Sequence, residues 1–213
     1  MQEPVPYPLG KQVLDRTVSA ALLVAAAPLF AGACVVMGAD MALCRGDRGP
    51  WLYRERRISR GREFDLLKFR TLRRDVLEAE GGVAGHARLF EADPKNLTWA
   101  ARRVLKRWYL DELPQLFNVL RGDLSLVGPR PWPLQMVAQQ VADGIDYRLR
   151  IMAGWTGPAQ VKKGITEPEG YTALDLGYVE ACHTSSARQL LRHDLGILLE
   201  TVKVVARGEG LEF

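Results

Sequence analysis

Hydrophobic positions along the chain are densest in one uncharged stretch near the N-terminus, from Val18 to Ala39. A helix rises about 1.5 Å per residue, so this stretch is long enough for the roughly 30 Å hydrocarbon core of a bilayer. Pro28 lies near its middle and lacks a backbone N–H, which predicts a bend. Basic residues lie on both flanks, and both flanks therefore favour the cytoplasmic side. The pattern predicts a re-entrant helix-break-helix, with Pro28 as the membrane break.

Three alternatives to a re-entrant hairpin stay open at this point. A basic start, an apolar run and small residues before Cys34 are also typical of a secretory signal. A buried helix in a soluble core is the second alternative, although an uncharged run of this length is unusual there. A single span with an exported domain is the third, and periplasmic labelling of residues before Lys11 would identify it.

Two β-prone runs follow, at residues 51–53 and 64–69, with a glycine-containing segment at 59–62 between them. Turn residues between two such runs predict a short β hairpin. Lys68 and Arg70 are two residues apart, which on a strand places both side chains on one face. There they are spaced to bind a phosphate or diphosphate, with ordinary exposed surface as the alternative.

Two further segments are characterised by composition and periodicity. Residues 78–85 are rich in glycine and predict a flexible loop, which could close over a site or be only a loop. Residues 185–206 carry apolar side chains at helical spacing and predict an amphipathic helix that lies on the core or on a membrane.

The most informative segment covers residues 106–120 and contains the adjacent acids Asp111 and Glu112. Apolar residues recur at helical spacing, at positions 113, 116, 117 and 120, and Pro114 is tolerated only in a first turn. The pattern therefore predicts a helix that begins near residue 110 or 111, with the acidic pair at its N-terminus.

Acids at a helix N-terminus have a particular chemistry. The free backbone N–H groups and the helix dipole favour a carboxylate, keep it ionised and attract phosphate oxygens. An ionised Asp111 can attack phosphorus, while Glu112, which points about 100° away around the helix, can hold Mg²⁺. The simpler alternative is that Asp111 is an N-cap and Glu112 an ordinary first-turn acid.

The helix is predicted to end at Gly122, and the chain continues into Val127-Gly128-Pro129-Arg130-Pro131. Prolines on both sides fix the backbone around the arginine as extended and rigid. Such a segment can hold one guanidinium at a set distance for bidentate contact with phosphate.

Charge and cysteine usage narrow the function classes. The net charge is +4, and basic residues outnumber acidic ones between positions 45 and 74, which indicates an anionic neighbour such as lipid headgroups or phosphorylated substrates. No groove-reading or base-stacking module is recognisable, so nucleic acid is not an expected partner. Cys34, Cys44 and Cys182 have neither metal-ligand nor disulfide spacing and are interpreted as small hydrophobic residues in a reducing compartment.

Three features together resemble the small monotopic phosphoglycosyl transferases of bacterial glycan assembly. They are KFRTL at 68–72, LDELPQLFNVLRGDLSLVGPRP at 110–131, and the proline-interrupted apolar segment before them. The resemblance covers nearly the whole chain. It implies an α+β, mainly helical, monotopic membrane protein with a small β hairpin. It divides the chain into an N-terminal arm and re-entrant hairpin at 1–44 and a cytosolic catalytic domain at 45–213, on the cytoplasmic face of the bacterial inner membrane.

The resemblance also implies a two-step reaction with Mg²⁺. Asp111 would attack the sugar-side phosphorus of a UDP-sugar, expel UMP and carry an aspartyl phosphosugar, with Glu112 as its metal-binding partner. Undecaprenyl phosphate, a polyprenol phosphate, would then attack and leave as polyprenol diphosphate sugar. Inner-membrane lipids are the expected surroundings, and downstream glycosyltransferases are possible partners. The sugar, the base, the lipid length, the pathway and the oligomeric state stay open.

Other positions match the family's binding residues. The expected substrate-binding residues are Lys68, Arg70, Lys106, Arg107, Pro129 and Arg130, with Asp175 at an acidic position where a structural salt bridge is equally expected.

The chain also departs from the family pattern. Trp108 and Tyr109 replace smaller residues and are expected to pack in the core. An arginine that the family has near positions 150–164 is missing, and the candidate replacements are Lys162, Lys163, Arg148 and Arg150.

A different function class also fits the residues. In a non-catalytic membrane scaffold, the basic hairpin would bind lipid headgroups and Asp111 would be only a cap. The change Asp111→Asn separates the two, because a cap survives it and a nucleophile does not.

Overall fold

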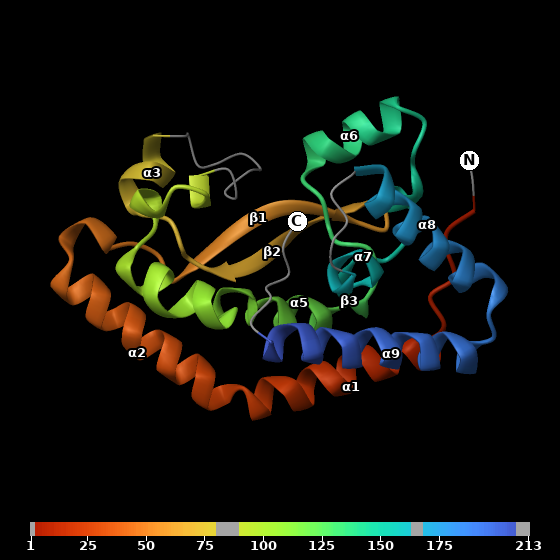
Figure 1. Ribbon diagram of the computed structural model, residues 1–213, viewed down its shortest axis with the longest axis horizontal. Helices are drawn as coiled ribbons and strands as arrows, with labels where there is room; N and C mark the ends of the chain where they lie inside the picture. The colour runs from red at the N-terminus through yellow and green to blue at the C-terminus, as the bar shows by residue number, and fades with distance from the viewer. Residues whose placement is uncertain (1–2, 80–89, 163–167, 208–213) are drawn as a thin grey trace.

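The computed structural model describes residues 3–79, 90–162 and 168–207 (Figure 1). Most of the predicted loop at 78–85 and Lys163 lie outside the described residues. The helices are α1 Leu9–Ala25, α2 Ala27–Leu43, α3 Arg74–Ala79, α5 Gln115–Arg121, α6 Leu134–Ala142, α7 Pro158–Val161, α8 Pro168–Thr184 and α9 Ala187–Ala206, and the strands are β1 Leu52–Ser59, β2 Arg62–Phe69, β3 Ser125–Val127 and β4 Gly154–Thr156. The fold is therefore mainly helical with a small hairpin, as predicted.

The N-terminal apolar stretch forms a bent helix pair. Helices α1 and α2 meet at Ala26 with a bend of 55°, and Pro28 lies in the first turn of α2, where its missing N–H is tolerated. Among the described residues no single helix is long and apolar enough to cross a bilayer, whereas this bent pair passes on length and composition together. The bend that Pro28 predicted is confirmed.

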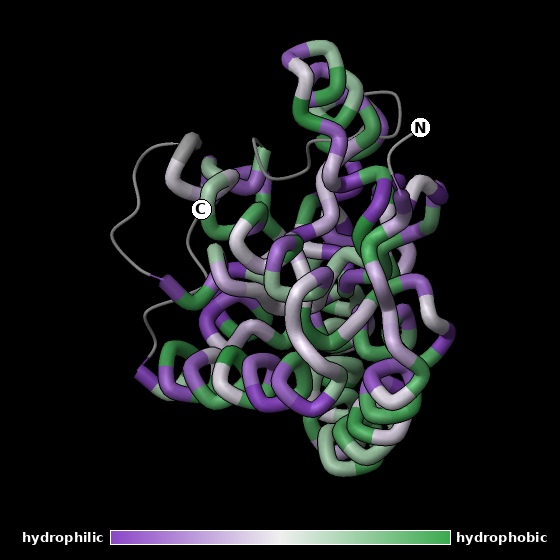
Figure 2. Tube along the Cα trace, turned by 90° about the vertical axis from the view of Figure 1, so that its right-hand side faces the viewer, coloured by the Kyte–Doolittle hydropathy of each residue, from purple (hydrophilic) through white to green (hydrophobic). Residues whose placement is uncertain are grey.

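The bent pair carries exposed apolar side chains along much of its length. They include Leu9, Val13, Leu22, Val24, Leu29, Val35 and Leu43, and the outer side of α9 adds Leu195, Leu199, Val202 and Val205. In Figure 2 the lowest part of the molecule, where α1 joins α2, is coloured hydrophobic almost throughout. These helices present one apolar underside to the surroundings.

The hairpin forms where the turn signal predicted it. Strands β1 and β2 pair antiparallel from Leu52 opposite Phe69 to Ser59 opposite Arg62. Arg60 and Gly61, between them, have φ of 49° and 73°, and two positive φ values give the turn whose twist matches a two-residue hairpin. Helix α5 lies between the hairpin and the α1–α2 pair (Figure 1).

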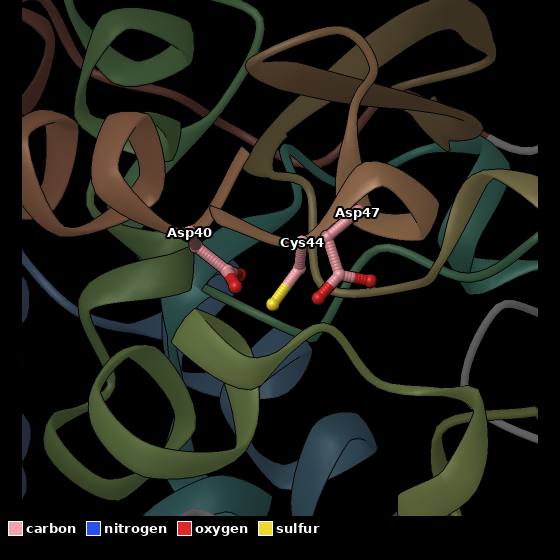
Figure 3. Close-up of side chains that lie close together, drawn as sticks. All are labelled: Asp40, Cys44 and Asp47. Carbon is pink, nitrogen blue, oxygen red and sulfur yellow. The ribbon is translucent and has the colours of Figure 1, made fainter. Parts of the chain in front are cut away.

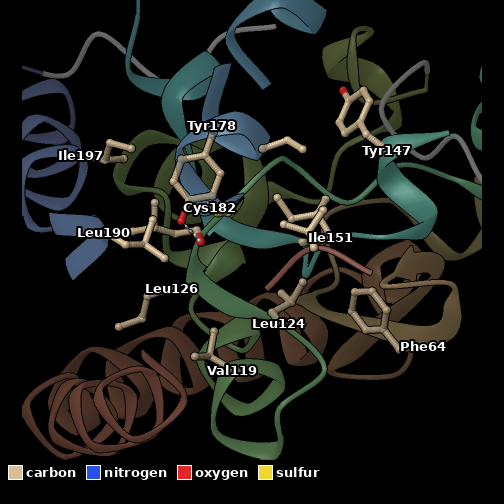
Figure 4. Close-up of a cluster of buried hydrophobic side chains, with 14 of the residues drawn as sticks. Phe64, Val119, Leu124, Leu126, Tyr147, Ile151, Tyr178, Cys182, Leu190 and Ile197 are labelled. Carbon is tan, nitrogen blue, oxygen red and sulfur yellow. Dashed lines mark hydrogen bonds between the residues drawn. The ribbon is translucent and has the colours of Figure 1, made fainter. Parts of the chain in front are cut away.

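The main hydrophobic core is assembled from segments far apart in the sequence. It brings together Phe64 of β2, Val119 of α5, Leu126 of β3, Tyr178 of α8 and Leu190 of α9 (Figure 4). Helix α9 starts with a capping box at Ser186 and turns its apolar side to this core, so the predicted amphipathic helix is confirmed.

Helix α1 contacts the rest of the protein through polar side chains as well. Lys11 is buried and its Nζ lies 2.5 Å from Asp194 of α9, which also accepts the Tyr178 hydroxyl at 2.7 Å. Asp15 is buried too and accepts the Ser125 hydroxyl of β3 at 2.7 Å. The N-terminal segment is therefore joined to the domain by buried hydrogen bonds and an ion pair.

Candidate active site

The acidic pair lies in an irregular segment and not at the start of an α-helix. A π-helical turn at Ala101–Leu105 is followed by two 3₁₀ turns, and Tyr109 between the 3₁₀ turns has a φ of 53°. The left-handed backbone at Tyr109 interrupts any continuous helix, since non-glycine residues rarely adopt it. Helix α5 begins only at Gln115, so the predicted start near residue 110 or 111 is wrong by about one turn.

Glu112 is tightly paired. Its Oε1 accepts a hydrogen bond from Arg130 Nη2 at 3.1 Å and lies 3.9 Å from Lys68 Nζ. Lys68 in turn lies 3.7 Å from Glu55 on the neighbouring strand. Lys68 and Arg130, both predicted to bind substrate, are thus brought to the acidic pair.

Asp111 differs from its neighbour. Its residue is only 7% exposed, yet its carboxylate has no hydrogen bond or ion pair with any residue in the part of the chain that the structure describes. No capping hydrogen bond from its side chain is found there either, which argues against the N-cap alternative. Asp111 is thus a buried carboxyl group that has no hydrogen-bonding or ion-pair partner among residues 3–79, 90–162 and 168–207.

The pKa values of the two acids move in opposite directions. Burial and then the adjacent Glu112 raise the pKa of Asp111 to about 7. Burial also acts on Glu112, but Arg130 and Lys68 outweigh it and lower the pKa of Glu112 to about 2. The prediction that Asp111 lies at an α-helix N-terminus is wrong, because the residue lies in a buried 3₁₀ turn beside a like charge, and this position raises its pKa.

Two other basic residues lie on the same segment. The Nζ of Lys106 contacts Glu91 at 2.7 Å, and its charge also lowers the pKa of Asp111. The guanidinium of Arg107 lies 5.8 Å from the centre of the Trp108 ring. Trp108 is 65% exposed, so the expectation that it packs in the core is wrong.

Arg70 does not share a face with Lys68. Strand β2 ends at Phe69, and the Arg70 side chain turns inward, where it is 1% exposed. Its nitrogens donate to the backbone carbonyls of Pro50 at 2.8 Å, Leu72 at 2.7 Å and Asp47. The predicted phosphate contact by Arg70 is corrected to a structural role in holding these loops.

The segment that presents Arg130 is fixed by a close backbone approach. A Cβ on Gly128 would lie 2.6 Å from the Met152 carbonyl, and one on Gly154 would lie 2.1 Å from the Gly128 nitrogen. The Pro129 carbonyl accepts the Gly154 N–H at 2.8 Å, and Pro129 is buried. Pro129 therefore shapes the segment, and its predicted contact with a substrate stays a prediction.

Behind this segment lies a buried arginine. Arg148 donates to the Arg130 carbonyl at 2.5 Å and to Asp175 at 2.7 Å, and stacks 3.9 Å from the centre of the Trp132 ring. Asp175 is 2% exposed and also accepts the Tyr147 hydroxyl at 2.7 Å. The structural alternative for Asp175 is supported, and Arg148 supports Arg130 from behind.

These contacts reduce the number of residues that could replace the missing family arginine. Arg148 is fully engaged with Arg130, Asp175 and Gln140, and Arg150 pairs with Asp146 at 2.8 Å. Lys162 is exposed at the edge of the described residues. Neither arginine is a bidentate phosphate ligand in this arrangement.

Sequence reasoning missed two acids at the site. Glu55 lies opposite Leu66, and Tyr53 lies opposite Lys68, so Glu55 and Lys68 are diagonal neighbours on one face of the hairpin. The register that follows from the Arg60-Gly61 turn could have shown this. Glu91 comes from a distant loop, and no local signal identifies its contact with Lys106.

The donor set at the acidic pair fits Mg²⁺. Two adjacent carboxylates offer hard oxygen ligands, which this ion prefers, and it is usually held by one or two of them together with substrate phosphates. The unpaired Asp111 carboxylate supports this fit, because a cation there would relieve its repulsion from Glu112.

Comparison with known proteins places the chain in a family. Residues 7–208 match the bacterial sugar transferase family. The chain belongs to the bacterial sugar transferases. The match spans the bent helix pair, the hairpin and the acidic pair together, so it is not carried by one short motif.

Several curated proteins are similar in sequence to this chain. The chain is 34% identical over 176 residues to "Undecaprenyl-phosphate galactose phosphotransferase" of Salmonella typhimurium, covering 77% of this chain and 35% of that protein. It is 33% identical over 185 residues to "Undecaprenyl-phosphate glucose phosphotransferase" of Komagataeibacter xylinus, covering 81% and 32%. These relatives are much longer, and the chain spans about a third of each.

One relative is closer in length. "UDP-glucose:undecaprenyl-phosphate glucose-1-phosphate transferase" of Caulobacter vibrioides is 37% identical over 205 residues, which is 91% of this chain and 68% of that protein. The family assignment therefore rests on most of both sequences in this case.

Proposed function

We propose that this bacterial sugar transferase moves a sugar 1-phosphate from a UDP-sugar to undecaprenyl phosphate and releases UMP. The observation that carries the proposal is the buried Asp111 carboxylate, which has no hydrogen bond or ion pair among the described residues, beside Glu112, which contacts Arg130 and Lys68. A carboxylate without protein partners keeps its lone pairs for an incoming electrophile. The names of the relatives, which include undecaprenyl-phosphate phosphotransferases, agree with this donor and acceptor.

In the first step an oxygen of Asp111 forms a bond to the phosphorus that bears the sugar. The bond from that phosphorus to the bridging oxygen breaks, and UMP leaves with the electron pair. In the second step an oxygen of undecaprenyl phosphate attacks the same phosphorus, and the Asp111 carboxylate is released. An already ionised phosphate needs no general base for this attack.

The basic residues around the pair bind and orient the phosphates. Arg130 is held by its rigid segment, and its guanidinium can meet phosphate oxygens in a bidentate manner while it retains Glu112. Lys68 and Lys106 add positive charge near Asp111. This charge stabilises the negative charge that accumulates on the reacting phosphorus and the leaving UMP.

Asp111 and Glu112 are the residues that would hold Mg²⁺. When bound, the ion would offset the repulsion between the carboxylate nucleophile and the diphosphate.

The apolar underside supports a place on the inner membrane, with the catalytic segment on the cytoplasmic face. Exposed Val24, Leu29 and Val35 on the bent pair would enter the lipid, and the arginines after α2 would meet anionic headgroups. A bent pair that enters and leaves one leaflet agrees with basic residues on both flanks.

The test is UMP release by purified protein in nanodiscs with Mg²⁺, undecaprenyl phosphate and a panel of UDP-sugars. We expect repeated turnover to need both the lipid and Asp111, with at most one UMP released per chain when the lipid is absent and none from Asp111→Asn. The matched control is Asp123→Asn, the same change beyond the other end of α5, where the carboxylate accepts hydrogen bonds from Arg121 and Asn118. No release from any donor by the folded wild-type protein would overturn the proposal and favour the scaffold.

A further inference from the structure

A second group of ligand atoms lies away from the acidic pair, where α2 ends. Asp40 lies in the last turn of α2, Cys44 follows the helix, and Asp47 ends the 3₁₀ turn Arg45–Asp47. One oxygen of each carboxylate and the Cys44 sulfur all lie within 4.8 Å of one another. Figure 3 shows the three side chains directed into the same space.

The chain geometry explains why these residues meet. Asp40 and Cys44 are four residues apart and therefore lie one helical turn apart on the same face. The 3₁₀ turn that follows bends the chain back and brings Asp47 beside them. The sequence alone shows only two acids and a cysteine, without the usual spacing of a metal site.

Helix capping explains part of this arrangement. Asp47 Oδ2 accepts the Trp99 N–H at 3.2 Å, and Asp40 Oδ2 accepts the Ala100 N–H at 2.9 Å. Both acids thus cap the start of the irregular segment that leads to Asp111. Capping uses one oxygen of each acid, and the Cys44 thiol lies next to both carboxylates, within hydrogen-bonding reach of Asp40.

The second carboxylate oxygen of Asp40 is the observation that indicates a bound ligand. Asp40 is 4% exposed, and its Oδ1 is buried without a hydrogen-bond partner in the part of the chain that the structure describes. Leaving a buried acceptor unsatisfied costs about 1 to 3 kcal/mol, and more for a charged group. An ion bound in the space shared with Cys44 would satisfy this oxygen.

The chemistry of the three ligands selects the kind of ion. A thiolate and two carboxylates suit Zn²⁺ and similar ions, whose bonds are about 2.3 Å to sulfur and 2.0 to 2.2 Å to oxygen. Mg²⁺ and Ca²⁺ prefer oxygen ligands alone, so the sulfur disfavours them. Cys44 is exposed, which leaves a route for the ion and a position for water as a fourth ligand.

The charges also balance. The buried guanidinium of Arg70 donates to the Asp47 backbone carbonyl, so one positive charge lies beside the cluster. With a divalent ion, the two carboxylates and one thiolate are matched by the ion and Arg70 together.

We propose that Asp40, Cys44 and Asp47 bind a thiolate-preferring divalent cation of the Zn²⁺ class. The ion holds Asp40 and Asp47 in the positions from which they accept the Trp99 and Ala100 N–H groups, at the start of the segment that leads to Asp111. This site is separate from the carboxylate pair and its role is structural.

The experiment uses Co²⁺ as a spectroscopic probe of the full chain in nanodiscs, after removal of metal by a chelator. We expect one Co²⁺ per chain with a thiolate-to-cobalt charge-transfer band, which Zn²⁺ abolishes by competition. Zn²⁺ at a free concentration of 100 times its Kd is expected to raise the Tm by roughly 5 to 10 °C. The acidic pair has no sulfur and cannot give this band.

Two cysteine variants make the test specific. Cys44→Ser is expected to lose the charge-transfer band and to weaken Co²⁺ binding at least tenfold. Cys34→Ser, an exposed thiol ten residues earlier on α2, is the matched control and should keep both. Absence of the band in the wild-type protein, or its survival in Cys44→Ser, would overturn the proposal.

Discussion

Asp111 and Asp194 are both buried carboxyl groups, and their surroundings are opposite. Asp194 is 1% exposed and meets the Lys11 ammonium at 2.5 Å and the Tyr178 hydroxyl at 2.7 Å. Asp111 is 7% exposed and has no such partner among the described residues. Burial raises the pKa of both, so the pKa alone does not separate them. The difference lies in whether the fold supplies a partner.

The two networks also differ in how they are assembled. The Lys11–Asp194 pair joins the first and last helices and closes a structural contact. At the acidic pair, Arg130 and Lys68 contact Glu112 and Lys106 contacts Glu91, whereas Asp111 has no such contact among the described residues. A buried carboxyl group without a partner is a candidate for completion by a ligand, which is why we propose Asp111 as the functional group.

Of the changes that test this comparison between Asp111 and Asp194, Asp111→Asn has the largest expected effect. We expect UMP formation to fall at least 1000-fold, or about 4 kcal/mol, because an amide is not a nucleophile toward phosphorus. The measurement is the initial rate of UMP release at saturating UDP-sugar. The protein should keep its Tm, since the change removes a buried charge that repels Glu112. A variant with more than a tenth of the wild-type rate would contradict the assignment.

The change Lys11→Met removes the partner of Asp194, and its expected effect is on stability. We expect a loss of about 3 kcal/mol in the free energy of unfolding, since the change leaves a buried carboxylate uncompensated. Thermal unfolding in detergent measures it. The double variant Lys11→Met with Asp194→Leu should recover much of the loss, because it removes both charges. Equal destabilisation by the single and double variants would argue against an uncompensated charge.

A smaller effect is expected from Arg130→Lys. A lysine keeps the charge but not the planar, bidentate geometry, and we expect kcat/KM to fall about 10- to 100-fold. Arg121→Lys is the matched control, because Arg121 forms an exposed pair with Asp123 and should leave the rate unchanged. Steady-state kinetics with the preferred UDP-sugar would show the difference, and equal rates for both variants would contradict the role of Arg130.

The smallest expected effect is a pH dependence of stability that comes from Asp111. Its pKa is raised in the folded protein to about 7, so the stability that its bound proton contributes is present below about pH 4 and is lost as the pH rises through 7. Between pH 6 and pH 8 we expect the wild-type protein to lose about 1 kcal/mol relative to Asp111→Asn. Paired melting curves in chelator would measure this, and parallel curves would show that the pKa of Asp111 is not raised.

The pKa of Glu112 is shifted in the opposite direction, so Glu112 does not affect the stability difference between pH 6 and pH 8. Its pKa is lowered in the folded protein to about 2, so its contribution is present above about pH 4.5 and is lost only as the pH falls toward 2. Both proteins retain Glu112, so its effect cancels in the comparison.

Features that depend on a few neighbouring residues could be predicted from the sequence. Pro28 determines the bend and Arg60-Gly61 determine the hairpin turn, because each acts through its own backbone. Gly122 ends α5 with a φ of 86°, as its position after an apolar periodic run indicated. The acidic pair and Arg130 were also found by local pattern, and the structure brings Arg130 to Glu112.

Features that depend on tertiary contacts could not be predicted. The direction of Arg70 follows from where β2 ends and which carbonyls lie within reach. The helix start was placed too early because no propensity rule predicts a left-handed Tyr109. Cys44 was interpreted as a small hydrophobic residue, yet it and Cys34 are exposed, and only Cys182 is buried. Its two acidic neighbours meet it only after the chain folds back.

The most direct test of the central claim is the intact mass of the purified protein after exposure to its UDP-sugar with Mg²⁺ but without undecaprenyl phosphate. The account predicts a mass increase equal to one sugar phosphate, located on the peptide that contains Asp111, absent in Asp111→Asn and removed when undecaprenyl phosphate is added. A wild-type protein that releases UMP only when both substrates are present, and never carries the adduct, would contradict a covalent role for Asp111.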